Sequence, residues 1–192
     1  MQVIAGMVAI AQAPALVIID MQRGMQASHL GPRNNPSAER NIAALLAHWR
    51  TQGYPVVHIR HISRSPDSVF RPGQPGCEFQ PALAPLAEEA VFEKNVPDAF
   101  IATQLERWLR LRSIDALVMV GVATNNSVEA TARTGGNLGF KVRVVSDATF
   151  TFDQQDLGGR LWPAEDIQAL SLSNLAMDYA TVVTTADCLT SA

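Results

Sequence analysis

Cysteine and charge are both scarce in this sequence of 192 residues. The two cysteines, Cys77 and Cys188, lie far apart and lack the close spacing of a zinc knuckle or a redox pair. A reducing compartment, the cytoplasm, is therefore the simpler location. Charged residues make up 17% of the chain, the formal net charge is -3, and the basic residues are scattered. No basic stripe indicates nucleic acid or an anionic membrane, so we expect a small-molecule partner.

Long apolar runs are also missing, since no stretch is long enough to span a bilayer. The segment from Met1 to Pro14 is apolar and ends in small residues, but no Lys or Arg precedes its apolar stretch. This argues against a signal peptide, and secretion stays the lesser alternative. We expect residues 1–13 to form an arm that packs on this subunit or on a neighbour. Few charges remain to cover the surface, which a buried subunit interface would explain.

Short apolar runs alternate with amphipathic stretches, which is typical of repeated βα units. The length suits a single domain, residues 1–192. The pattern predicts a three-layer αβα, Rossmann-like fold, in which helices cover both faces of a six-stranded parallel sheet. The predicted strands are Ala15–Ile19, Pro55–Ile59, Ala90–Glu93, Ala116–Val120, Lys141–Val145 and Ala180–Thr184.

Apolar residues at helical spacing predict four helices between these strands. The first runs from Pro36 and Ser37 to Gly53, the second contains Ile101, Leu105, Trp108 and Leu109, the third covers about 126–138, and the fourth covers Pro163 to about Met177. Between residues 63 and 85 the prolines and glycines predict a long irregular loop. Long loops in compact domains are usually functional or disordered.

Polar residues stand where three of the predicted strands end. Asp20 follows the first strand, Lys94 the third, and the turn Gly121–Ser127 the fourth. The carboxyl ends of parallel strands share one edge of the sheet, where open α/β sheets bind their ligands. Burial would raise the pKa of Asp20 unless a cation lay near, and Lys94 could be that cation. From spacing alone, a structural ion pair is the favoured interpretation of these two residues.

The turn after the fourth strand leads directly into a helix. Asn126, with Glu129 three residues later, has the form of a capping box, which places Ser127 in the first helical position. Backbone N–H groups there have no helical partner, and the helix dipole favours an anion beside them. This environment suits an oxyanion. Serine is also simply favoured at helix starts, so that plainer interpretation stays open.

These features together resemble the isochorismatase-like hydrolases, a family of cysteine hydrolases. The family includes nicotinamidases, N-carbamoylsarcosine amidases, ureidoacrylate amidases and isochorismatases. The resemblance is carried by Ala15–Gln22 (ALVIIDMQ), by Glu93–Asn95, and by Gly121–Thr131, which follows G-V-x-T-x-x-C-V-x-x-T with Ser127 at the cysteine position. Residues 139–148 also look like the family's fifth strand, and the likeness extends over about residues 14–188.

The resemblance implies a catalytic triad at the sheet edge. Asp20 would take the nucleophile's proton, Lys94 would steady the charges, and Ser127 would be the nucleophile. The backbone amides of Ala123 and Ser127 would hold the oxyanion, and the bond between Val122 and Ala123 would be a cis peptide. The resemblance further implies hydrolysis of an amide-like C–N bond in a small molecule, and assembly as a homodimer or homotetramer.

Ser127 departs from the family pattern and leaves two alternatives open. A serine hydroxyl needs a base as it attacks, and the Asp20 carboxylate would have to be that base. One alternative is an isochorismatase-type vinyl-ether hydrolase that uses Asp20 as a general acid. The other is a small-ligand binding protein that has lost catalysis. The pair of Asp20 and Lys94 counts against pure binding, because a buried charge pair is costly to desolvate.

Other residues are weaker candidates. His58 and His61 lack the short cluster of one Asp and two His with which nicotinamidases bind metal, so we expect no metal. No phosphate-binding glycine loop follows the first strand, so we expect no nucleotide cofactor. Cys77 could act as a surrogate thiol, although a lone loop cysteine is more often a packed residue. Candidate pocket residues are Arg23, Arg60, Phe70, Phe100 and Trp162.

Overall fold

A computed structural model describes residues 13–190, so nearly all of the expected N-terminal arm lies outside the described residues. A parallel sheet runs in the order β3-β2-β1-β4-β5-β8. Its strands are β1 (Ala15–Ile19), β2 (Val56–His61), β3 (Ala90–Lys94), β4 (Ala116–Val122), β5 (Lys141–Phe150) and β8 (Thr181–Val183). The predicted three-layer fold with six parallel strands is confirmed.

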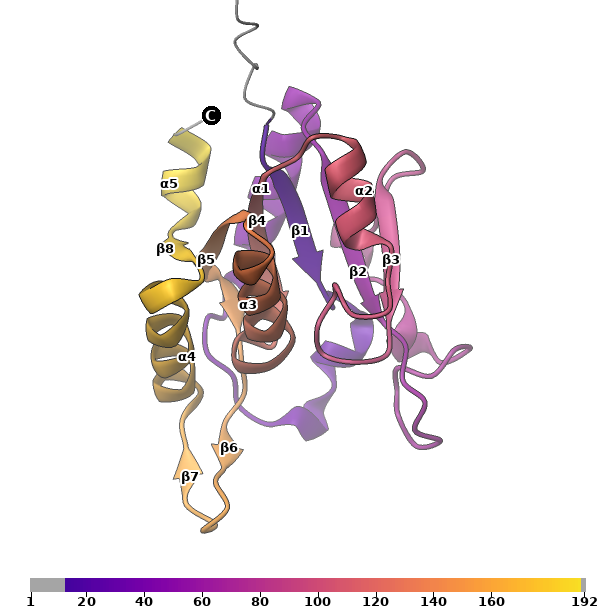
Figure 1. Cartoon of the computed structure of the whole chain (residues 1–192). Helices are drawn as coiled ribbons and strands as arrows, with labels where there is room; N and C mark the ends of the chain where they lie inside the picture. Colours follow the sequence, from indigo (N-terminus) through magenta and orange to yellow (C-terminus); the bar gives the residue numbers. More distant parts are fainter. Residues whose placement is uncertain (1–12, 191–192) are drawn as a thin grey trace, which may run out of the picture.

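Helices cover both faces of this sheet (Figure 1). One face carries α1 (Ala38–Gln52) and α5 (Thr185–Thr190), and the other carries α2 (Leu105–Leu111), α3 (Glu129–Asn137) and α4 (Ala164–Asp178). Side chains of β1 alternate between the two cores: Leu16 packs with the residues of α1, and Val17 with those of α2 and α3. Burial on both faces explains why the central strands are continuous apolar runs.

Two helix starts differ from the sequence prediction. Ile101 is 51% exposed in a turn, and α2 begins only at Leu105. A π-helical turn, Thr124–Val128, precedes α3, so α3 begins at Glu129. The predicted capping box is wrong, because the wide turn is closed by the Val128 N–H donating to Ala123 O, and no side chain caps it.

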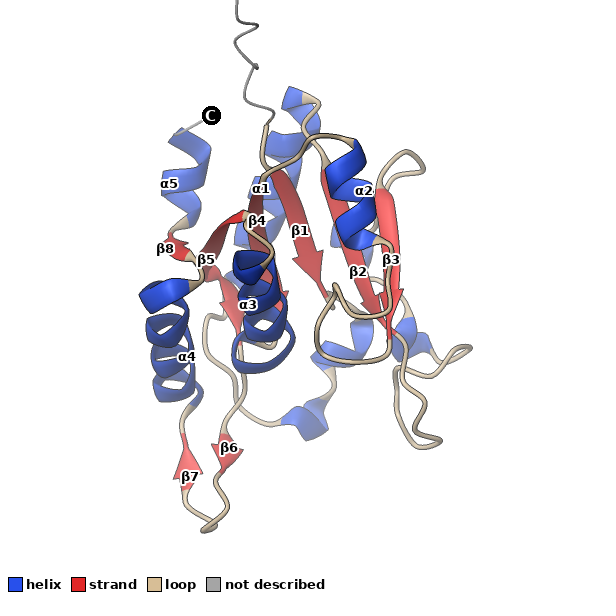
Figure 2. Cartoon of the chain, in the orientation of Figure 1, coloured by secondary structure: helices blue, strands red, loops and turns tan. Residues whose placement is uncertain are grey.

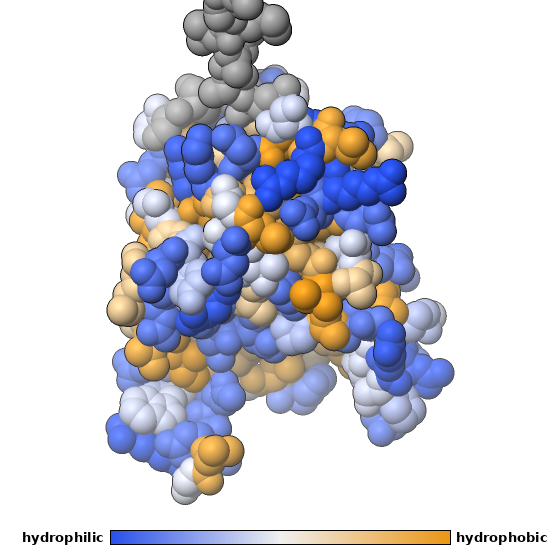
Figure 3. Space-filling model, viewed as in Figure 1, coloured by the Kyte–Doolittle hydropathy of each residue, from blue (hydrophilic) through white to orange (hydrophobic). Residues whose placement is uncertain are grey.

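The sequence prediction missed a hairpin and the last helix. The hairpin pairs β6 (Gln154–Gln155) with β7 (Leu161–Trp162) and projects beyond the carboxyl ends of the strands (Figure 2). Figure 3 shows this projection extending from the body, mostly hydrophilic but with an apolar group near its end. Leu157 and Leu161, at 110% and 58%, are among its exposed residues.

The proline-rich stretch between β2 and β3 is irregular, as predicted. It contains two short 3-10 turns, Pro75–Cys77 and Pro81–Leu83. An isolated bridge between Gln22 and Phe79 attaches the stretch to the segment after β1. Across residues 13–190, no helix has the length and apolarity needed to cross a membrane.

Candidate active site

Three buried polar side chains meet at the carboxyl edge of the sheet. Asp20 follows β1, Lys94 ends β3, and Ser127 lies in the π-helical turn after β4. Lys94 Nζ donates to Asp20 Oδ2 at 2.7 Å and to Ser127 Oγ at 3.1 Å. The exposed fractions of Asp20, Lys94 and Ser127 are 1%, 3% and 6%. The structure thus brings together the three residues on which the sequence prediction rested.

The backbone around Asp20 allows little freedom. Asp20 has a φ of +54°, in the left-handed region, and its N–H donates to Ile59 O at 3.0 Å. On the neighbouring strand, Gly121 has a φ of +119°, and a Cβ there would lie 2.1 Å from Ile19 O. Only glycine avoids this clash, so the close approach of β1 and β4 beside the site depends on Gly121.

Burial raises the pKa of the Asp20 carboxyl, while Lys94 and the Ser127 hydroxyl favour its ionised form. Asp20 Oδ2 is occupied by Lys94, but Oδ1 is buried and has no hydrogen-bond partner within residues 13–190. A buried polar atom without a partner costs free energy. A bound molecule that donates to Asp20 Oδ1 would remove this cost.

The peptide bond between Val122 and Ala123 is cis. The carbonyl oxygen of Ala123 accepts hydrogen bonds from the N–H groups of Asn126, at 3.1 Å, and Val128, at 3.2 Å. Both neighbours of Ser127 are therefore tied to the same carbonyl group, which fixes the backbone that carries the Ser127 hydroxyl.

Three of the predicted pocket residues lie on the surface around this edge. Trp162 lines a cavity of about 540 Å³ between the hairpin, the π-helical turn and α4. Arg60 lines a smaller cavity of about 280 Å³ and forms an ion pair with Glu93. Arg23 is half exposed and bonds Glu78 at 3.1 Å.

The two predicted phenylalanines have different positions. The ring of Phe70 packs edge-on against His61, with centroids 6.0 Å apart. The prediction that Phe100 lines the pocket is wrong, because Phe100 belongs to the hydrophobic core. Its ring stacks on that of Phe140, with centroids 5.7 Å apart. Phe100 also lies beneath α3, where a Cβ at Gly135 would be 3.4 Å from the Phe100 ring and 3.1 Å from Val142.

His58 and His61 point to opposite faces of the sheet, since three positions along a strand reverse the side-chain direction. His58 bonds Glu89 at 2.9 Å on the α1 side, and burial lowers its pKa. His61 pairs in register with Lys94. Cys77 is buried, and burial raises the pKa of its thiol, which is the opposite of an activated nucleophile.

Sequence reasoning gave no role to Gln22, which is completely buried. Its Nε2 donates to His61 O at 3.0 Å and to Cys77 O at 2.9 Å, and its Oε1 accepts from the His61 N–H at 2.8 Å. Gln22 thereby links the end of β2 to the proline-rich stretch. The available signal was its position two residues after Asp20, in the segment Ala15–Gln22.

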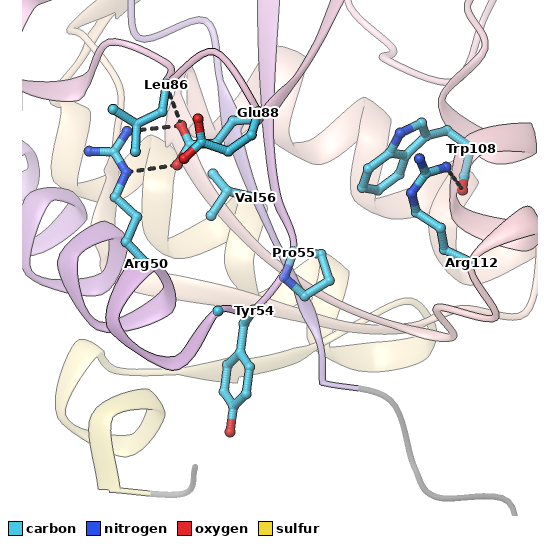
Figure 4. A pocket seen from close by; sticks show the side chains of 10 residues that line it. Arg50, Tyr54, Pro55, Val56, Leu86, Glu88, Trp108 and Arg112 are labelled. Carbon is cyan, nitrogen blue, oxygen red and sulfur yellow. Dashed lines mark hydrogen bonds and ion pairs between the residues drawn. The ribbon is translucent and has the colours of Figure 1, made fainter.

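A further cavity of about 380 Å³ lies at the opposite edge of the sheet, near the amino end of β2 (Figure 4). Arg50, Tyr54 and Val56 contribute to its lining, and the guanidinium of Arg50 bonds Glu89. This cavity is separate from the cluster at the carboxyl edge.

The fold and the cluster of Asp20, Lys94 and Ser127 define a class of protein: a three-layer α/β protein with a buried carboxylate, lysine and hydroxyl at the carboxyl edge of a parallel sheet. The chain belongs to the isochorismatase family, because the isochorismatase domain model matches residues 14–187. It is 38% identical over 171 residues to the isochorismatase family protein YrdC of Bacillus subtilis, covering 89% of this chain and 91% of that protein.

Two further relatives are informative. A crystal structure of an isochorismatase-family protein from Chromobacterium violaceum matches with a TM-score of 0.91 and 46% identity, covering 94% of this chain and 93% of that one. The nicotinamidase/pyrazinamidase of Mycobacterium tuberculosis is 32% identical over 158 residues, covering 70% of this chain and 85% of that protein.

Proposed function

We propose that this protein hydrolyses an amide-like C–N bond of a small molecule, with Ser127 as the nucleophile. The observation that carries the proposal is the position of Lys94 Nζ, which bonds both Asp20 Oδ2 and Ser127 Oγ in a buried site. The relation to a nicotinamidase/pyrazinamidase, named for its action on amides, supports this choice of bond. No cofactor is needed for the chemistry.

In the first half of the proposed reaction, Asp20 removes the Ser127 hydroxyl proton as Oγ attacks the carbonyl carbon. The new C–O bond moves the carbonyl π electrons onto oxygen, and the N–H groups of Ala123 and Ser127 stabilise that oxyanion. The carbonyl then re-forms, the C–N bond breaks, and the proton on Asp20 passes to the departing nitrogen. Lys94 keeps Asp20 oriented and balances its charge. Water then hydrolyses the ester on Ser127.

A second candidate function uses Asp20 as a general acid on a vinyl ether. Two observations favour it: burial raises the pKa of Asp20, and Oδ1 has no partner in the described part of the chain. A protonated carboxyl could donate from Oδ1 to a substrate. Ser127 forms no covalent bond in this scheme.

The two schemes, and a protein that only binds, differ in how they respond to mutation. Wild type, Ser127→Ala, Ser127→Cys and Asp20→Asn are assayed against one panel of small amides and vinyl ethers, with the exposed Ser173→Ala as the control. The amide scheme requires that Ser127→Ala and Asp20→Asn both lose turnover, while Ser127→Cys retains or raises it.

Other patterns contradict the amide scheme. In the ether scheme Ser127→Ala costs little and Asp20→Asn abolishes turnover. Full activity in Asp20→Asn rejects both enzymatic schemes. A protein that only binds turns over nothing in any variant, and calorimetry then finds ligand affinity preserved in both Ser127→Ala and Asp20→Asn.

For assembly and location we propose a homodimer or homotetramer in the cytoplasm. Exposed apolar side chains on the hairpin and α4, Leu161 and Leu170 among them, support an interface between copies. Light scattering at micromolar concentration should give a mass two or four times 20.8 kDa. A clean monomer contradicts the assembly.

A further inference from the structure

His61 shares both the edge and the face of the sheet with the Asp20–Lys94–Ser127 cluster. It is the last residue of β2 and lies in register with Lys94, the last residue of β3. Side chains two positions apart point to the same face, so His61 follows Val57 and Ile59, which pack against the α2 and α3 side. The turn that carries Ser127 leads into α3, on that same side.

The surrounding residues hold His61 firmly. Gln22 accepts from its N–H and donates to its carbonyl oxygen, so one buried side chain fixes the backbone on both sides of the ring. The edge of Phe70 packs on the imidazole. Phe70 in turn occupies space next to Gly24, where a Cβ would lie 2.6 Å from the Phe70 ring. Packing and hydrogen bonds that hold a side chain in one position are typical of functional residues.

The His61 ring differs from the cluster in two respects. It is partly exposed, and neither ring nitrogen has a hydrogen-bond partner among residues 13–190. Burial and the Lys94 cation lower the pKa of His61, and Asp20 opposes them. The ring is therefore neutral at neutral pH, which leaves one nitrogen able to accept a proton.

We propose that His61 is a further catalytic residue, the base that activates the water for hydrolysis of the acyl group on Ser127. This inference rests on the proposed amide hydrolysis. His61 removes a proton from water as the water oxygen bonds to the ester carbonyl carbon. The bond to Ser127 Oγ then breaks, Oγ takes the proton back from the imidazolium, and the carboxylic acid leaves. Atoms and charge balance without another reactant.

Accessibility favours His61 over Asp20 for this step. Asp20 is 1% exposed and its Oδ2 is bonded to Lys94. The acyl group on Ser127 closes the site further. His61 is partly exposed, so its imidazole is open to a water from solvent, whereas the Asp20 carboxylate is buried.

The test uses 4-nitrophenyl acetate in a stopped-flow assay, because its good leaving group makes release of the acetyl group the slow step. Wild type, His61→Gln, His61→Ala and Ser127→Ala are compared, with the exposed His29→Gln as the control. His61→Gln should keep the initial burst of nitrophenolate, while its steady-state rate falls about 10²–10⁴-fold. Its kcat and KM should fall together, so that kcat/KM stays near the wild-type value.

Two measurements separate catalysis from structural damage. Mass spectrometry should find acetyl-Ser127 accumulating in His61→Gln. After subtraction of the enzyme-free reaction of imidazole with the ester, added imidazole should restore the steady-state rate of His61→Ala but leave that of wild type unchanged. A wild-type steady-state rate in His61→Gln, or equal loss of burst and steady state without imidazole rescue, overturns the role of His61. If wild type and Ser127→Ala give the same rate, the proposed function itself fails and the role of His61 fails with it.

Discussion

Replacing Lys94 by Met tests whether the buried cation supports Asp20. Met has a similar length, so the change removes the charge and the two hydrogen bonds of Nζ while largely preserving the volume. The Asp20 carboxyl then remains 1% exposed without a cation. Breaking one side of a buried ion pair costs about 3–5 kcal/mol, because the other charge is left uncompensated. In a domain of this size that corresponds to a fall in Tm of roughly 6–20 °C.

The pH dependence of this loss has a definite sign. The pKa of Asp20 in the folded protein is raised by burial above its ordinary value of 3.8. The stability contributed by a carboxyl whose pKa is raised by folding is fully present below pH 3.8 and is lost as the pH rises through the folded-state pKa. Lys94 opposes the shift, so Lys94→Met raises the pKa of Asp20 further. The free energy lost by Lys94→Met should be smallest near pH 3.8 and grow toward neutrality.

Urea unfolding of four proteins at about pH 4 and about pH 7 measures this effect. They are wild type, Lys94→Met, the double change Asp20→Asn with Lys94→Met, and the control Lys141→Met. The double change should recover much of the stability, because neither charge is then left alone. Lys141 forms a surface pair with Asp115 and is 77% exposed, so its loss should stay below about 1 kcal/mol. A Lys94→Met loss independent of pH, or a double variant as unstable as the single one, refutes the reasoning.

Two other predictions concern the scaffold. In urea unfolding, Gly121→Ala should lower the free energy of unfolding by at least about 2 kcal/mol more than Gly139→Ala. Both glycines have a positive φ, but only at Gly121 would a Cβ clash with the backbone, at Ile19 O. Equal losses in the two variants contradict the clash. Burial alone would raise the pKa of Glu89, but hydrogen bonds from Arg50 hold that pKa at about 2, below its ordinary value of 4.5. The stability that Glu89→Gln removes, about 1–3 kcal/mol, is thus present above pH 4.5 and should vanish as the pH falls toward about 2; a loss that persists there contradicts the linkage.

The sheet was predictable because its central strands are buried on both faces. No polar residue interrupts the apolar runs that predict them, at Ala15–Ile19 and from Ala116 onward. The hairpin β6–β7 and the helix α5 were missed, because two-residue strands and a six-residue helix carry too few residues for a periodic signal.

The candidate site was predictable where chain direction alone determines position. Asp20 and Lys94 end parallel strands, so they had to share an edge. Phe100 was misassigned because a sequence does not tell an aromatic residue beside a pocket from one beneath a helix. Gln22 was overlooked because its role depends on backbone groups of His61 and Cys77, residues distant in the sequence. The π-helical turn at Asn126 was read as a capped α-helix, since both begin with similar residues.

The most direct test of the central claim is whether an acyl group passes through Ser127. Two amides with the same acyl group and different leaving amines, both substrates of the wild type, are hydrolysed in the presence of hydroxylamine, and the ratio of hydroxamate to carboxylic acid is measured. A common acyl-Ser127 intermediate predicts the same ratio for both amides, and no hydroxamate from Ser127→Ala. A ratio that changes with the leaving amine, or hydrolysis by Ser127→Ala at the wild-type rate, would contradict the account.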